Sequence, residues 1–227
     1  MSTYLFIGAS SAMAQATCQQ LISTGHRVIG VSRSEVNGYS DLLIAAEYSL
    51  DQLPEITEKL DGLVYFPGTI NLKPFHRYKQ EEVMNDLTVN VLGAFQSIQK
   101  YLPNLKQGSN PSIVLFSSVA ASTGMTFHSS IAMAKGAIEG LTCSLAAEFA
   151  PTIRVNAIAP SLTNTPLGEK FLSTPEKMEA SAQRNPMKMV GTTADLSNSI
   201  EFLLSEKSAW ITGQILHVDG GMGTLRG

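Results

Sequence analysis

A lysine in apolar surroundings is the first sign of chemistry in this chain. Lys135 lies in the run HSSIAMAKGA, residues 128–137, where its neighbours are small or apolar. Burying a charged amine costs free energy unless something nearby uses the charge. The nearest ionisable side chain in the run is His128, seven residues earlier. Because imidazole exchanges protons near neutral pH, His128 is a competent proton donor.

A second candidate site is the turn GASSAMAQ, residues 8–15, which follows a short apolar run. A strand, a tight glycine turn and a helix N-terminus present free N–H groups to a pyrophosphate. The glycine fingerprint is only partly met, because Ala12 and Ala14 stand where its later glycines would be. An ordinary strand–helix turn is the alternative. The candidate cofactor-binding residues here are Gly8, Ser10, Ser11, Ala12 and Met13.

The end of the second apolar run bears on which cofactor this turn would accept. Dinucleotide folds that prefer NAD place an acidic residue there for the ribose 2′-hydroxyl. This chain has Ser32 followed by Arg33. A guanidinium suits a 2′-phosphate by charge and by bidentate geometry, so NADP is favoured over NAD. The alternative is a solvated surface arginine.

The composition limits the class of protein. A chain of 227 residues, 44% hydrophobic and 15% charged, suits one compact domain with a large core. The net charge of −3 argues against nucleic acid or an anionic membrane as a partner. No apolar run approaches the ~18 residues of a membrane span. Cys18 and Cys143 have no metal-ligand spacing and are expected to be reduced core thiols, which indicates a cytoplasmic protein without a metal site.

Apolar runs of strand length alternate with helical patterns along the chain. This alternation predicts an α/β fold with a doubly wound parallel sheet, whose ligands bind at the carboxyl ends of the strands. A stretch rich in Thr, Ser and Pro, residues 162–186, is a candidate lid, or else an ordinary helical excursion. The expected strands cover residues 4–7, 26–31, 63–66, 112–116, 154–158 and 214–218. The expected helices cover residues 12–23, 81–102, 131–149 and 193–204.

Several longer stretches together resemble the short-chain dehydrogenase/reductase family, and they are closest to its small single-domain acyl-carrier-protein reductases. They are DLTVNVLGAF (86–95), FSSVAAS (116–122), residues 132–167 and ITGQILHVDGG (211–221). The resemblance covers almost the whole chain in the right order. It implies one Rossmann-type domain over residues 1–227. Residues 1–110 would form mainly the nucleotide-binding half, and residues 111–227 the catalytic and substrate half.

The resemblance also implies roles for single residues. Ser118 matches the serine that hydrogen-bonds the substrate carbonyl, and Asn90 the asparagine that holds a helix distortion and a relay water. Lys135 matches the lysine that binds the nicotinamide ribose, and Gly68 a glycine near the adenosine ribose. The segment that cradles the nicotinamide carboxamide matches Pro160, Leu162, Thr163 and Thr165.

The chain departs from the family pattern in three places. Ser161 replaces a glycine, and Tyr-Phe-Pro-Gly (65–68) replaces Asn-Asn-Ala-Gly, so apolar bulk is expected in place of polar contacts between strands. Ile131 stands where the family has its proton-donating tyrosine, and isoleucine cannot exchange a proton. In the enoyl reductase branch the tyrosine lies seven residues before the lysine, at the position of His128. His128 is therefore a substitute acid, a substrate-binding group or an ordinary loop residue.

We therefore expect an NADP-dependent oxidoreductase that transfers hydride to or from a small carbonyl, alcohol or enoyl substrate. The proton would come from His128 or water, with Tyr65 as a further possible donor. Apolar residues in the candidate lid suggest an apolar substrate. The alternative is a non-catalytic nucleotide-binding protein that acts as an oligomer partner or sensor. The resemblance also implies a homodimer or homotetramer.

Overall fold

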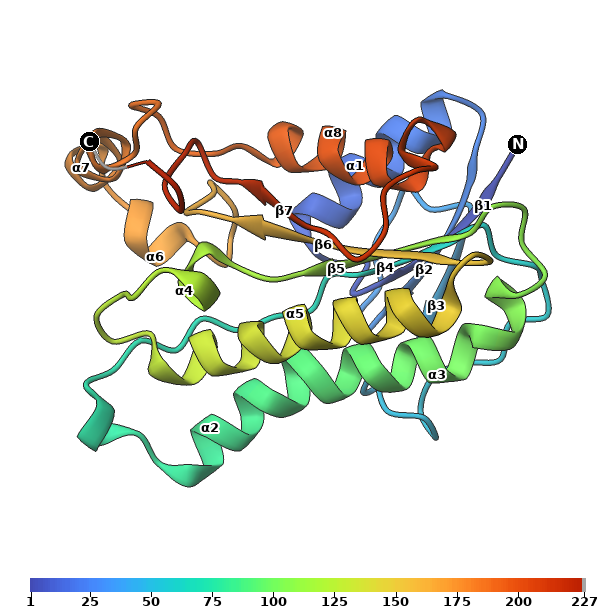
Figure 1. Ribbon diagram of the computed structural model, residues 1–227, viewed down its shortest axis with the longest axis horizontal. Helices are drawn as coiled ribbons and strands as arrows, with labels where there is room; N and C mark the ends of the chain where they lie inside the picture. Colours follow the sequence, from blue (N-terminus) through green and yellow to red (C-terminus); the bar gives the residue numbers. More distant parts are fainter. Residues whose placement is uncertain (226–227) are drawn as a thin grey trace.

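The carboxyl ends of parallel strands define one edge of this molecule (Figure 1). Within residues 1–225, which this computed structural model describes, the strands pair in parallel in the order β3-β2-β1-β4-β5-β6-β7. The chain steps outward from β1 in both directions, so a crevice for ligands is expected beside β1 and β4. The strands are β1 (Thr3–Ile7), β2 (Arg27–Ser32), β3 (Asp41–Ile44), β4 (Gly62–Tyr65), β5 (Ser112–Phe116), β6 (Arg154–Pro160) and β7 (Ile215–Val218).

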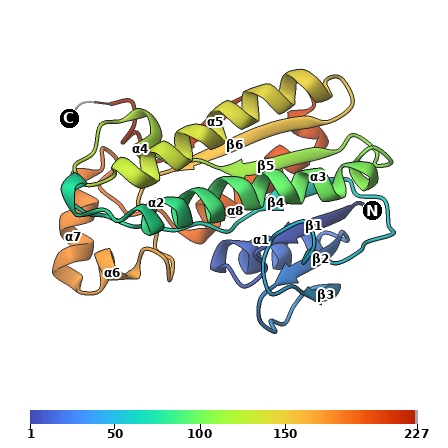
Figure 2. The same ribbon diagram turned by 90° about the horizontal axis from the view of Figure 1, so that it is seen from below.

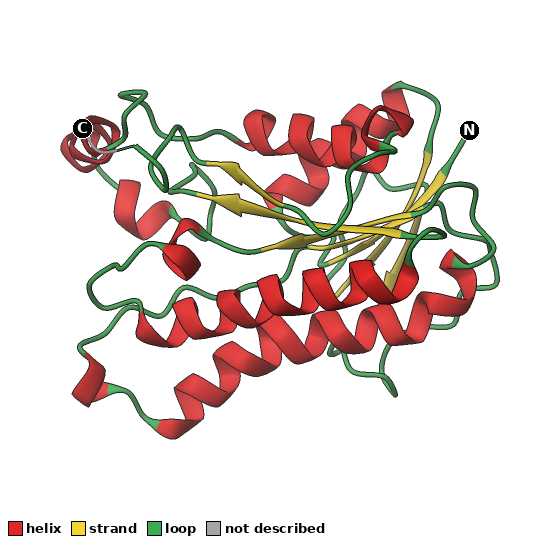
Figure 3. Ribbon diagram, viewed as in Figure 1, coloured by secondary structure: helices red, strands yellow, loops and turns green. Residues whose placement is uncertain are grey.

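Helices cover both faces of the sheet (Figures 1 and 3). α1 (Ala12–Ser23) and α8 (Thr193–Leu204) pack together on one face, and α3 (Gly93–Leu105) and α5 (Ser129–Phe149) cover the other. Shorter helices gather near the carboxyl edge, as Figure 2 shows from below. They are α2 (Gln80–Leu87), α4 (Val119–Ser122), α6 (Glu169–Leu172) and α7 (Pro175–Arg184). This arrangement confirms the predicted doubly wound fold.

The continuous apolar strands are explained by burial on both faces. Leu5 and Ile7 of β1 belong to the core beneath α3 and α5. Tyr4 and Phe6, which alternate with them, belong to the core beneath α1 and α8. Successive side chains of a strand point to opposite faces, so a strand with two covered faces carries no polar alternation. No helix among the described residues is long and apolar enough to cross a membrane.

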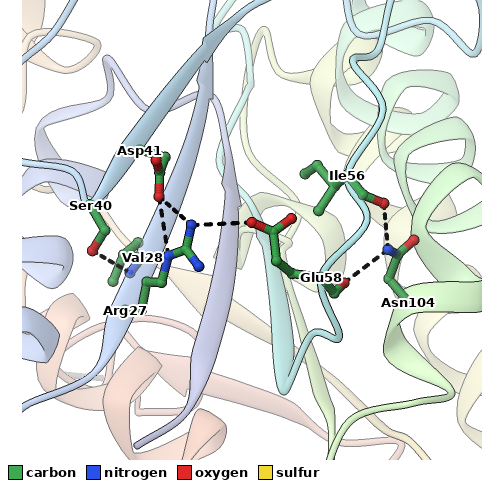
Figure 4. Close-up of polar contacts among 7 residues, drawn as sticks. All are labelled: Arg27, Val28, Ser40, Asp41, Ile56, Glu58 and Asn104. Atoms are coloured by element: carbon green, nitrogen blue, oxygen red, sulfur yellow. Dashed lines mark hydrogen bonds and ion pairs between the residues drawn. The ribbon is translucent and has the colours of Figure 1, made fainter.

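The edge strand β3 was not predicted. Only its two central residues are shielded in part, so DLLI lacks the buried apolar run of the other strands. An ion pair attaches it to β2, because Arg27 contacts Asp41 at 2.5 Å and Glu58 at 3.2 Å (Figure 4). In the same view, the Asn104 amide donates to the carbonyl oxygens of Ile56 and Glu58.

Two further expectations were wrong in detail. The helix expected over residues 81–102 is divided by a π-helical segment, η2 (Thr88–Leu92), and α3 continues through the exposed Pro103 to Leu105. Cys143 is exposed on α5, whereas Cys18 is buried as expected. The apolar pattern around Cys143 in the sequence did not reveal that this side chain is exposed.

Candidate active site

The turn after β1 presents an open helix N-terminus. Gly8 adopts a positive φ of 82°, and the N–H groups of Gly8 and Ala9 both donate to the Val31 carbonyl oxygen at 2.9 and 3.0 Å. α1 then begins at Ala12 without a side-chain cap from Ser11 and without an acidic residue in its first turn. The N–H groups of that turn are therefore available to an anion, as the sequence predicted for a pyrophosphate.

Neighbouring side chains hold this turn from two sides. A Cβ on Gly8 would lie 2.8 Å from Cδ of Pro67, so glycine is required here both for φ and for space. On the other side the Tyr39 hydroxyl donates to the Ala9 carbonyl oxygen at 2.8 Å. Pro67 thus packs directly against the turn that follows β1, a contact that sequence reasoning did not predict.

Arg33 lies at the same edge of the sheet. It follows β2, which pairs with β1, and its side chain is exposed. The guanidinium carbon lies 6.0 Å from the ring centroid of Tyr48, a cation–π distance. Ser32 is fully buried, and its hydroxyl accepts the Ser34 N–H at 3.3 Å. The Arg33 side chain is therefore exposed at this edge, whereas the Ser32 side chain is buried.

The structure brings Lys135, Asn90 and Gly68 together. Lys135 is 8% exposed, and its Nζ donates to the Phe116 carbonyl oxygen at 2.9 Å. A Cβ on Gly68 would lie 3.2 Å from Asn90 Oδ1 and 3.5 Å from Lys135 Nζ. Both polar atoms therefore face the same point at the end of β4.

Asn90 lies within η2, where the resemblance implied a helix distortion. Its amide nitrogen donates to the Asp86 carbonyl oxygen at 2.8 Å and to Thr69 Oγ1 at 2.9 Å. Its Oδ1 is buried without a hydrogen-bond partner. Because buried polar atoms are rarely left unpaired, this oxygen is suited to accept a hydrogen bond from a group bound beside Lys135.

Asp86 is the functional residue that sequence reasoning missed. Its carboxylate is fully buried and accepts hydrogen bonds from Thr69 at 2.5 Å, Asn71 at 2.7 Å and Ser130 at 2.6 Å. The available signal was its position one helical turn before Asn90, which places both side chains on one face of the helix. Ser130 connects this carboxylate to the start of α5.

Burial lowers the pKa of Lys135 from its ordinary value of 10.5 to about 8, and the negative charge of Asp86 acts in the opposite direction. Burial disfavours the charged amine, whereas a nearby anion favours it. The lysine is therefore poised to change its charge closer to neutral pH than a solvated lysine.

Ser118 is the N-cap residue of α4, just after the carboxyl end of β5. Its Oγ accepts the Ala120 N–H at 3.2 Å, and it lies two residues after the carbonyl that holds Lys135. The preceding Ser117 donates instead to Glu139 of α5 at 2.6 Å. Ile131 is 4% exposed, so the position where the resemblance implied a tyrosine hydroxyl presents buried hydrocarbon.

His128 lies immediately before α5, and its Nδ1 is 2.7 Å from the Thr126 carbonyl oxygen. It lines a cavity of about 450 Å³ with Lys73, Phe75 and residues of α4. Neither Ser118 nor Lys135 is among the lining residues described for that cavity. Within residues 1–225 His128 makes no hydrogen bond or ion pair with either of them, and its role stays a prediction.

Tyr65 carries a polar contact that the sequence analysis did not expect. Its hydroxyl donates to the Val89 carbonyl oxygen at 2.6 Å. Because this contact runs to a helix, it leaves the expectation about contacts between strands unchanged. The ring of Phe66 packs against Phe6 and Phe116, which is the apolar bulk expected there.

The segment after β6 reaches the same edge. Pro160 ends the strand, and the Ser161 hydroxyl donates to the Asp219 carbonyl oxygen at 3.0 Å. Thr163 is buried and forms an isolated parallel β-bridge with Gly191. The Gly191 N–H donates to the Leu162 carbonyl oxygen. Thr165 Oγ1 accepts the Gly168 N–H at 3.3 Å.

The candidate lid over residues 162–186 contains two helices, α6 and α7, joined by short non-helical segments. Lys170 of α6 donates to the Ile70 carbonyl oxygen at 2.8 Å, so this segment crosses to the loop after β4.

Comparisons with known proteins agree with this geometry. The family model described as Enoyl-(Acyl carrier protein) reductase matches residues 45–223. A tropinone reductase homolog of Arabidopsis thaliana is 33% identical, with 96% of this chain and 91% of the relative covered. A 3-oxoacyl-[acyl-carrier-protein] reductase of Thermotoga maritima is 31% identical, with 96% of each covered. This chain belongs to the short-chain dehydrogenase/reductase family.

Solved structures place this short-chain dehydrogenase/reductase in the same fold. The ligand-free aldohexose dehydrogenase of Thermoplasma acidophilum has a TM-score of 0.91 and 27% identity, covering 99% of this chain and 95% of its own. A short-chain type dehydrogenase/reductase of Mycobacterium ulcerans has a TM-score of 0.89 and 25% identity, covering 100% and 91%. The chain is an oxidoreductase. The open α1 N-terminus and the unpaired Asn90 Oδ1 beside Lys135 fit a nicotinamide cofactor.

Proposed function

We propose that this chain is an NADP-dependent oxidoreductase acting on a small carbonyl, alcohol or enoyl substrate, with an atypical proton donor. The observation that carries the proposal is the buried Lys135 facing the unpaired Asn90 Oδ1 at the end of β4. A lysine held in apolar surroundings has little purpose in a mere scaffold. When bound at this edge, the nicotinamide would supply the hydride chemistry.

The chain's own residues divide the remaining work. The N–H groups of the α1 turn would bind the pyrophosphate, and Arg33 the 2′-phosphate. Lys135 would bind the ribose hydroxyls, while the segment from Pro160 to Thr165 would orient the carboxamide. Ser118 would donate a hydrogen bond to the substrate oxygen, stabilising charge that develops there.

The proton must come from a group other than residue 131. His128 or water is proposed for this step. A general acid typically contributes about 10²- to 10⁴-fold in rate, so turnover is expected to be slow if water alone serves. Tyr65 is a poorer candidate, because its hydroxyl already donates to Val89 and burial raises its pKa.

The second candidate function is a non-catalytic nucleotide-binding protein that acts as an oligomer partner or sensor. The buried Ile131 favours it, because the position can neither donate nor accept a proton. In either case we propose a homodimer or homotetramer that contacts itself through α3 and α5. We also propose a cytoplasmic location, with which the two unpaired cysteines agree.

A substrate panel separates the two functions. Oxidation of NADPH is followed with small aldehydes, ketones, β-keto thioesters and enoyl thioesters, for the wild type and for Ser118→Ala, Ile131→Tyr and His128→Gln. The oxidoreductase predicts turnover that Ser118→Ala reduces and Ile131→Tyr increases by tenfold or more. His128→Gln lowers turnover only if the imidazole is the donor. Cofactor binding without turnover in any variant would favour the non-catalytic protein.

A further inference from the structure

The hydroxyl of Tyr65 links the central sheet to the π-helical segment that carries Asn90. Tyr65 ends β4 and is 2% exposed. Its hydroxyl donates to the Val89 carbonyl oxygen at 2.6 Å, and Val89 directly precedes Asn90. A tyrosine at the end of a strand thus contacts the main chain of a helix on the neighbouring layer.

The Val89 carbonyl is available because the helix is π-helical here. In an α-helix it would accept the N–H of Gly93, four residues later. That N–H donates instead to the Thr88 carbonyl oxygen, five residues earlier. A carbonyl deprived of its helical donor needs another partner. Tyr65 provides it, as the Asn90 side chain does for the Asp86 carbonyl oxygen at 2.8 Å.

Gly93 leaves the space that the tyrosine occupies. A Cβ at Gly93 would lie 2.1 Å from the Tyr65 hydroxyl oxygen and 3.1 Å from Cζ. The hydroxyl therefore excludes any side chain at residue 93, although alanine is much the better helix former. The Tyr65 hydroxyl can reach Val89 only because residue 93 is a glycine.

We infer that Tyr65 is a positioning residue, whose hydroxyl holds η2 in its π-helical form and so keeps Asn90 directed at Lys135. This inference rests on the proposed function for its effect on turnover. It assigns Tyr65 a role other than proton donation. The inference follows from the donor shift at Gly93, the short contact at Val89 and the unpaired Asn90 Oδ1.

The first test is a double-mutant cycle on stability, made with Tyr65→Phe and Gly93→Ala. Alone, Gly93→Ala is expected to lower the urea midpoint, because its methyl group meets the hydroxyl. In the Tyr65→Phe background only the 3.1 Å contact to the ring remains, so the same change is expected to lower the midpoint much less. Equal effects of Gly93→Ala in both backgrounds would overturn the inference.

The second test separates positioning from mere stability. Tyr101→Phe is the matched control, because Tyr101 is equally buried in α3 and donates to the Pro54 carbonyl oxygen at 2.9 Å. Tyr65→Phe is expected to lower turnover about 10- to 100-fold with NADPH affinity within about twofold, while Tyr101→Phe leaves both unchanged. Equal loss of turnover in the two variants would contradict positioning.

Hydrogen exchange tests the role of Tyr65 independently of the proposed oxidoreductase activity. If the wild type turns over no substrate, the proposed function fails, yet the cycle still tests the contact. In that case amide exchange over residues 88–93 is compared between the two tyrosine variants. The inference predicts faster exchange there in Tyr65→Phe only. Unchanged exchange in Tyr65→Phe would overturn it.

Discussion

The negative charge of Asp86 offsets part of the effect that burial has on the ammonium group of Lys135. Burial alone lowers the lysine pKa, and the charge of Asp86 raises it, with a resulting value of about 8. Asp86 is itself kept in place by Thr69, Asn71 and Ser130. The charge of Lys135 therefore depends on a residue from a different helix.

The depressed pKa of Lys135 predicts a particular dependence of stability on pH. In the pH range between the folded-state pKa of about 8 and the ordinary pKa of 10.5, Lys135 is protonated in the unfolded chain and neutral in the folded chain. The free energy of unfolding therefore rises with pH through this window. Relative to Lys135→Met, the wild type is expected to gain up to roughly 3 kcal/mol across it. Urea denaturation of both proteins measures the difference, and a difference independent of pH would contradict the assignment.

Replacement of Asp86 by asparagine should move the pH dependence of cofactor affinity. Without the anion the pKa of Lys135 falls further, so NADPH affinity is expected to decline at a lower pH than in the wild type. Asp61→Asn is the control, because Asp61 is also buried but accepts the N–H groups of Thr3 and Ser109 away from the site. The measurement is a titration with NADPH over a pH series. Identical profiles for Asp86→Asn and the wild type would disprove the coupling.

Arg33→Asp tests the choice of cofactor. A carboxylate repels a 2′-phosphate and can accept from a ribose 2′-hydroxyl, so preference should turn from NADPH to NADH. The loss of one charge-assisted contact, worth about 1.5–3 kcal/mol, corresponds to roughly 10- to 100-fold weaker NADPH binding. Lys59→Asp makes the same charge change at an exposed residue before β4. If both variants lose NADPH affinity equally, Arg33 is only a surface charge.

Exposed apolar side chains on the α3 and α5 layer predict self-association. Phe95 is 47% exposed and Met133 is 49% exposed. Exposed apolar patches mark interaction surfaces, so Phe95→Glu and Met133→Glu are expected to shift the protein to monomer in sedimentation experiments. Leu50→Glu, at a residue 40% exposed on the loop before β4, should leave the association state unchanged. A wild type that sediments as a monomer would refute the proposed oligomer.

The sequence predicted most of the fold and the residues whose types carry the family pattern. Apolar runs such as Ser112–Phe116 are buried on both faces, so their strands are evident without tertiary information. The family resemblance pointed to Lys135, Asn90 and Gly68, and the structure brings them together. β3 was not predicted because a short, half-exposed edge strand has no such apolar pattern.

What the sequence could not give are contacts between distant elements. Asp86 is an ordinary helical acid until Ser130, 44 residues later, and Thr69 are seen to donate to it. The hydroxyl of Tyr65 likewise finds its partner only because η2 shifts the donor of Val89. Such contacts depend on how layers pack, which periodicity and residue type do not determine.

Binding of the reduced cofactors to the wild type tests the central claim most directly. Thermal unfolding is followed with increasing NADPH and, separately, NADH. At 100 times its dissociation constant a ligand adds about 2.7 kcal/mol to the free energy of unfolding. The account predicts that the same rise in Tm is reached at a lower concentration of NADPH than of NADH. No rise with either nucleotide would contradict it.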